Sequence, residues 1–85
     1  MGGSIEKKAI GRITHYFPKV GVAVVELSAD LKKGELVTIG GKSETFDQTI
    51  TSMQIDKKEV PVGKKGQAIG LKVEKPVKEG DIVWR

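Results

Sequence analysis

His15 is the only histidine in the sequence, and it is the first residue to consider for general acid–base chemistry. A catalytic histidine needs a nucleophile or a second titratable group, yet the chain has no cysteine and no Gly-x-Ser-x-Gly turn. The serines Ser28, Ser43 and Ser52 fall in stretches typical of turns and strands, and no pair of carboxylates stands out. We therefore expect no enzymatic activity and no catalytic residue, with His15 packed at a rim of the fold and donating one ring N–H to a carbonyl.

The sequence also offers no clear site for a metal, a cofactor or a nucleotide. A lone histidine without cysteines cannot build a zinc site unless several carboxylates join it, so no metal and no cofactor are expected. Gly41-Lys42-Ser43 looks like the end of a phosphate-binding loop, but the position five residues earlier is Leu36 instead of glycine, and no helix follows. We interpret this segment as a hairpin turn and expect no small-molecule substrate.

The chain is basic, with fifteen Lys and Arg against eleven Asp and Glu and a formal net charge of +4. Such a balance favours contact with phosphates or with an acidic partner. Most lysines stand in pairs, each within the expected N-terminal segment or a turn: Lys7-Lys8, Lys32-Lys33, Lys57-Lys58 and Lys64-Lys65. Lysines in such places ordinarily keep the surface soluble, so charge alone does not choose a partner.

Two kinds of binding site remain open from the residues. One stretch interleaves positive charge with aromatic rings, the combination that stacks bases and meets phosphates in RNA-binding barrels. The candidate nucleic-acid residues are Arg12, His15, Tyr16 and Lys19, together with Lys57 and Lys58. The alternative is an apolar rim that docks on another protein, for which the candidates are Tyr16, Phe17 and Trp84.

The length of 85 residues suits one domain with one core. We expect that domain to span residues 9–85, and residues 1–8 to be disordered or partly left over from cloning. No window approaches the ~18 apolar residues needed to cross a bilayer, and the first residues lack the apolar block of a signal peptide. A cytoplasmic protein without a membrane partner is therefore expected.

Six stretches rich in β-branched and aromatic residues, separated by Gly and Pro, predict β-strands. They cover residues 9–17, 20–27, 36–39, 45–55, 66–73 and 82–84. Ile69, Leu71 and Val73 recur every two residues, which places them on one core-facing side. Residues 20–27 are apolar at successive positions and predict the most buried strand, covered on both faces. Without helical periodicity, the class is all-β, a small antiparallel barrel or sandwich.

Glycines mark where these strands are expected to bend or turn. Gly11 predicts a bulge or a close backbone approach, and a second bulge is expected near Thr51 or Ser52, where the apolar positions change phase. Lys33-Gly34-Glu35 and Glu79-Gly80-Asp81 each precede a short apolar strand. This echo is interpreted as shared turn chemistry instead of a structural repeat.

The order of these features resembles a known barrel. The chain contains, in sequence, Leu31-Lys-Lys-Gly-Glu-Leu-Val, Ile50-Thr-Ser-Met-Gln, Gly66-Gln-Ala-Ile-Gly-Leu-Lys-Val and Val77-Lys-Glu-Gly-Asp-Ile-Val. Together they resemble the second domain of translational GTPases such as elongation factor Tu. The stretch from Ile13 to Leu27 is similar to stand-alone translation elongation factor-like proteins and to the C-terminal barrel of collagenase-like peptidases. The resemblance covers roughly residues 9–84 and implies a six- or seven-stranded antiparallel barrel.

This resemblance implies a non-catalytic translation-associated module that contacts tRNA, ribosomal RNA or the ribosome, since the chain contains no GTPase domain. The sequence departs from the GTPase pattern at Val24-Val25, where Gly-Arg is expected, and at Gln67, where an acid is expected. The RNA-facing residues are therefore not carried over one by one. The alternative hypothesis is a barrel that packs on a partner protein, an enzyme or a factor, without touching RNA.

Overall fold

The computed structural model describes residues 8–41 and 44–85, which contain ten β-strands and no helix. The strands are β1 (Ala9–Phe17), β2 (Val22–Leu27), β3 (Leu31–Lys32), β4 (Leu36–Gly40), β5 (Thr45–Thr49), β6 (Met53–Ile55), β7 (Lys58–Glu59), β8 (Val62–Gly63), β9 (Ala68–Lys72) and β10 (Ile82–Trp84). Residues 1–7 and the Lys42-Ser43 part of the expected hairpin turn lie outside the described residues.

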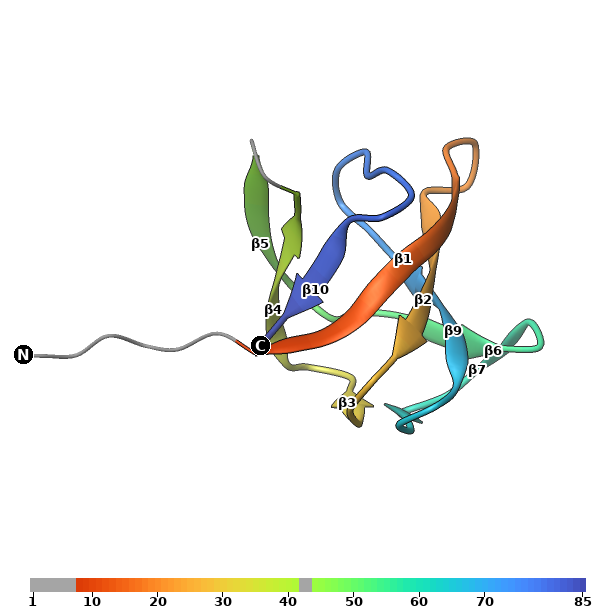
Figure 1. Cartoon of the computed structure of the whole chain (residues 1–85). Helices are drawn as coiled ribbons and strands as arrows, with labels where there is room; N and C mark the ends of the chain where they lie inside the picture. Colours follow the sequence, from red (N-terminus) through yellow and green to blue (C-terminus); the bar gives the residue numbers. More distant parts are fainter. Residues whose placement is uncertain (1–7, 42–43) are drawn as a thin grey trace, which may run out of the picture.

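Eight strands form one antiparallel sheet in the order β5-β4-β10-β1-β2-β9-β6-β7, and β3 pairs with β8 in a separate ribbon. Figure 1 shows the large sheet curling around an interior, with β5 and β4 on one side and β9 and β6 on the other. The predicted class, an all-β antiparallel barrel, is therefore confirmed in a partly closed form. The strands outnumber the expected six or seven because β3, β7 and β8 are two-residue pairings within expected turns.

The core lies inside this curl and is built from alternate residues of the strands. Ile69, Leu71 and Val73 are 1%, 0% and 6% exposed, which confirms that they share a buried face. The other buried apolar residues are Ile10, Ile13, Ala23, Val25, Leu27, Leu31, Val37, Ile39, Ile50, Met53, Val77 and Val83. One core thus draws on both ends of the described chain.

The strand expected to be covered on both faces is β2, and that expectation is wrong. Ala23, Val25 and Leu27 are buried, whereas Glu26 on the other face is exposed. Val20 is not in the strand at all and lies 64% exposed in the turn before it. A single curled sheet encloses its core on one side only, so the outer face of even a central strand meets solvent.

The expected long strand over residues 45–55 is broken in the structure, and no bulge near Thr51 or Ser52 joins its halves. β5 pairs with β4, whereas β6 pairs with β9 on the other side of the barrel. Ile50 still bonds to the β4 side, because its N–H donates to the carbonyl of Glu35 at 2.8 Å. Two residues later, the carbonyl of Ser52 accepts from the N–H of Lys72 on the β9 side, at 3.2 Å. The phase change therefore marks the point where the chain changes neighbours.

The turn chemistry predicted around Gly34 and Gly80 is confirmed, and a third turn of the same kind occurs at residues 64–67. In each, the N–H of a lysine donates to the side chain three residues later: to Glu35 and Gln67 at 2.8 Å and to Asp81 at 3.0 Å. The glycine between has a positive φ of 95°, 89° or 93°. Such a φ at the third residue suits glycine in a type II turn. The third case was missed because glutamine stands in place of the acid.

Substitution of Gly80 is a test of this turn geometry. Gly80→Ala is expected to lower the free energy of unfolding by about 1 kcal/mol, because alanine is strained at positive φ. No heavy atom lies within 4 Å of the added Cβ, so packing is not involved. Gly80→Asn is expected to cost less, since asparagine tolerates positive φ. Urea unfolding of the three proteins measures the difference, and equal losses for both variants would contradict a backbone cause.

Gly11 is confirmed at a place of close backbone approach. The register of β1 against β10 shifts between Ala9 and Gly11, as the expected bulge requires. A Cβ at residue 11 would lie 2.6 Å from Cγ1 of Val25 and 3.3 Å from the carbonyl oxygen of Glu26. The absence of a side chain at this residue lets β1 and β2 pack closely.

Candidate functional site

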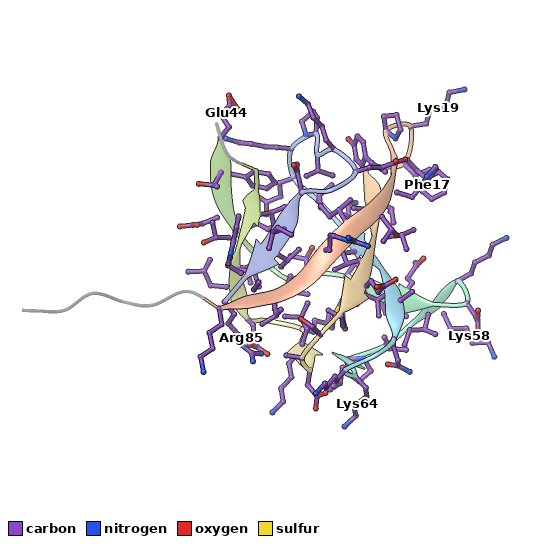
Figure 2. The ribbon with its side chains drawn as sticks, viewed as in Figure 1. Phe17, Lys19, Glu44, Lys58, Lys64 and Arg85 are labelled. Atoms are coloured by element: carbon purple, nitrogen blue, oxygen red, sulfur yellow. The ribbon has the colours of Figure 1, made fainter. Side chains whose placement is uncertain are left out.

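The turn between β1 and β2 presents two large apolar side chains to solvent. Phe17 is 46% exposed and Val20 is 64% exposed, and Pro18 and Lys19 between them are also exposed. The N–H groups of Val20 and Gly21 both donate to the carbonyl of Phe17, at 3.3 Å and 2.9 Å. Figure 2 shows Phe17 and Lys19 at the outer end of this hairpin. We name residues 17–21 the hairpin tip.

His15 lies beside the hairpin tip on the outer face of β1. Its ring centroid is 4.5 Å from that of Phe17, and the two planes meet at 58°. Its Nδ1 is 3.3 Å from Oε2 of Glu79, and both side chains are more than half exposed. The partner of His15 is therefore the carboxylate of Glu79, on the segment that leads to β10, instead of the expected carbonyl. The arrangement supports the side of the hairpin tip.

Tyr16 does not join Phe17, because successive residues of a strand point to opposite faces. Tyr16 is half-buried and packs against the core, so it contributes little to the outer surface. Arg12 is exposed on the outer face and borders a shallow pocket that Glu79 also lines. The register of β1 against β2 shifts between Ile13 and His15, which brings Arg12 onto the exposed face of His15 and Phe17, whereas Tyr16 lies on the other face.

The lysines do not gather around this stretch. Lys57 and Lys58 belong to the β6–β7 hairpin, where Asp56 and Lys57 both have positive φ, as a type I′ turn requires. Figure 2 shows Lys19, Lys58 and Lys64 at three separate places on the barrel. Lys64 lies 4.0 Å from the carboxylate of Asp30 and therefore has an acidic neighbour. The structure offers no single basic face that unites the candidates.

Trp84 lies at the opposite end of the sheet from the hairpin tip. It is half-buried on β10 and stands across from Thr38, which shares an outer face with the 62% exposed Leu36. The two ends of the described chain meet here, since Lys8 and Arg85 exchange backbone hydrogen bonds of 3.1 Å and 2.9 Å. Figure 1 shows the C-terminus far from the β1–β2 turn. The proposed rim of Tyr16, Phe17 and Trp84 is therefore not one surface.

Val20 is the residue of the hairpin tip that the sequence interpretation missed, because it was assigned to a buried strand. The signal was present in the spacing of Pro18 and Gly21, a proline and a glycine that bracket a tight turn. Within residues 8–41 and 44–85, no three His, Cys, Asp or Glu side chains come close enough to hold a metal ion. The described part of the chain also has no helix long and apolar enough to cross a membrane.

Fold and surface together define a small antiparallel barrel with an exposed apolar hairpin tip. No family model matches the chain. The chain is 42% identical over 79 residues to an uncharacterized protease of Methanocaldococcus jannaschii, an alignment that covers 92% of this chain and 19% of the relative. The chain thus spans about a fifth of the length of that curated relative.

Two crystal structures of one domain share this fold. Both are of the C-terminal domain of a Geobacillus thermoleovorans protein named as a U32 peptidase. The selenomethionine variant has a TM-score of 0.86 at 23% identity and covers 92% of this chain and 99% of that domain. The other has a TM-score of 0.83 at 22% identity and covers 94% and 96%. Of the resemblances inferred from sequence, the one to peptidase C-terminal barrels thus has structural counterparts, whereas the relation to the GTPase barrel is not shown.

Proposed function

We propose that residues 9–85 form a non-catalytic protein-docking domain that acts with a U32-peptidase-like catalytic protein. The observation that carries this proposal is the hairpin tip, where Phe17 and Val20 stay exposed on a short hydrogen-bonded turn. Exposed apolar groups held on a hydrogen-bonded turn favour association, because part of the conformational entropy has already been lost before they are buried. The similarity to a protease and to a peptidase C-terminal domain supports this class of partner.

Calorimetric titration with a purified partner tests this proposal. The partner is the Methanocaldococcus jannaschii relative from which the matching 79 residues have been removed. We expect the intact barrel to bind it, and the double variant Phe17→Ser, Val20→Ser to bind at least about tenfold more weakly, because buried apolar anchors dominate interface energies. The matched control is Leu36→Ser, an equally exposed apolar residue at the other end of the sheet.

Two results would contradict the proposal in different ways. Absence of binding by the intact barrel would remove the partner class. A loss of binding in the Leu36→Ser protein with no loss in the hairpin-tip variant would move the docking surface to the face beside the chain ends.

The nucleic-acid hypothesis has less support, because its candidate residues do not share a basic face. We expect fluorescence anisotropy with tRNA and ribosomal RNA fragments to show no more than weak binding that salt abolishes. Arg12→Ala with Lys19→Ala is expected to leave that binding unchanged. Salt-sensitive binding that this double variant removes would favour a translation-associated role.

A further inference from the structure

The barrel closes along a seam between residues 45–55 and 70–76, and the closure changes character along its length. At one end the main chains pair directly, Met53 with Leu71. Further along, the closure is made by one side chain. The Gln48 amide donates to the carbonyl of Lys72 at 2.9 Å and accepts from the N–H of Glu74 at 2.9 Å.

Beyond Gln48 the seam is open, and a pocket of about 510 Å³ lies there. Thr45 and Phe46 line one wall, and Lys75 and Pro76 line the other. Figure 1 shows β5 at the margin of the sheet, opposite the long segment that connects β9 with β10. The volume of the pocket is in the range typical of ligand sites. We name it the seam pocket.

The free edge of β5 directs backbone groups into this pocket. The N–H of Gly41 donates to the carbonyl of Glu44 at 3.1 Å, and that of Ile50 to Glu35 at 2.8 Å, so these pairs are hydrogen-bonded pairs of the β4–β5 ladder. Such pairs alternate with pairs whose N–H and C=O groups point away from the partner strand. Thr45 belongs to the second kind. Its backbone donor and acceptor therefore face the seam instead of β4.

Four charged side chains line the seam pocket, the lysines Lys75 and Lys78 and the carboxylates of Glu44 and Asp81, and the two lysines can receive an anionic group. Lys75 Nζ lies 5.8 Å from the ring centroid of Phe46, and Lys78 also lines the pocket. Within the described ranges neither lysine has a carboxylate within 4.0 Å. The carboxylate of Asp81 is already held, since its Oδ2 accepts from the N–H of Lys78 at 3.0 Å. Glu44, which directly precedes β5, also lines the pocket.

We propose that the seam pocket binds an extended peptide segment that carries an acidic side chain. The segment adds to the edge of β5 and bonds the N–H and C=O of Thr45, as in β-strand addition. Its apolar side chains pack on Phe46 and Pro76, and its carboxylate pairs with Lys75 and Lys78. No residue of the hairpin tip lines this pocket, so it is a second site. This peptide-binding proposal rests on the proposed function only in one respect, namely that the partner is a protein.

Two libraries of acetylated and amidated pentapeptides test the proposal. One library has Glu at the central position and the other has Lys, with the remaining positions varied among Thr, Val, Ile and Phe. We expect the best Glu peptides to bind about fivefold more tightly than the best Lys peptides, the factor that an exposed ion pair supplies. In the amide NMR spectrum of the barrel, the chemical-shift changes on peptide binding are expected at Thr45, Phe46 and Lys75.

Three changes probe the binding mode. Thr45→Pro is expected to abolish peptide binding, because it removes the outward donor without removing a bond to β4. Lys75→Glu is expected to weaken it about fivefold, whereas the matched control Lys57→Glu, at the β6–β7 turn, is expected to leave it unchanged. A peptide methylated on alternate backbone nitrogens is expected not to bind, and this control holds even if Thr45→Pro fails to fold.

The proposal is overturned if the Lys library binds as well as the Glu library, if the methylated peptide binds unchanged, or if the shifts lie at the hairpin tip. The Phe17→Ser, Val20→Ser protein should bind the peptides normally. Peptide binding without docking on the protease relative would therefore refute the proposed partner alone. Docking without peptide binding would refute the seam pocket alone.

Discussion

Replacing Gln48 with alanine is expected to lower the free energy of unfolding by about 2 kcal/mol, because two part-buried hydrogen bonds at the seam are lost. The side chain is 3% exposed, and its amide is the bridge between β5 and the chain after β9. Without it, the carbonyl of Lys72 and the N–H of Glu74 lose part-buried hydrogen bonds, at a cost of about 0.5–1.5 kcal/mol for each.

Urea unfolding at neutral pH measures this loss, and Gln54→Ala is the matched control. Gln54 is an exposed glutamine on β6, so its replacement is expected to change stability by less than about 0.5 kcal/mol. If the two variants are equally stable, the side-chain bridge does not hold the barrel closed. A larger fall in stability at Gln48 supports the division of the seam into a closed part and an open pocket.

The second large effect is expected at Gly11. Gly11→Ala should destabilise the barrel by about 1–3 kcal/mol, because the new Cβ would overlap Cγ1 of Val25, only 2.6 Å away. Val25 is fully buried in the neighbouring strand, so it cannot move aside without disturbing the core.

A double-mutant cycle with Val25→Ala separates this clash from a general loss of strand structure. The single change Val25→Ala should cost about 2 kcal/mol, because two buried methyl groups are lost. In the double variant the clash is absent, so the two costs should sum to more than the measured loss by at least about 0.5 kcal/mol. Thermal and urea unfolding of the four proteins test this. Strict additivity would show that the close approach of residue 11 to Val25 does not affect stability.

Local features of the fold were predictable because neighbouring residues produce them. The alternation of Ile69, Leu71 and Val73 is a property of any half-buried strand, and it held in the structure. Gly34 and Gly80 adopt the positive φ that their turns require, which follows from the chemistry of four consecutive residues. Phe17, at the centre of the candidate docking site, was identified from its aromatic character near a turn.

Features that depend on neighbours distant in the chain were not predictable in the same way. Periodicity reports which face of a strand is buried, but not which strand lies beside it. The change of partner between β5 and β6 therefore looked like a bulge in one strand. In the sequence Gln48 is indistinguishable from an ordinary polar strand residue, because both of its hydrogen-bond partners belong to a later segment.

The two candidate sites show the same division. The hairpin tip is one continuous run of residues, so the sequence alone determined most of it. The seam pocket exists only because the curl of the sheet brings Thr45 and Phe46 opposite Lys75 and Pro76. Tertiary structure likewise separated Trp84, which pairs with Ala9, from Phe17 at the other end of β1, and it dispersed the lysines. Side-chain type and turn chemistry depend on residues that are neighbours in the sequence. Whether distant residues come together on one surface depends instead on which strands pair and how the sheet closes.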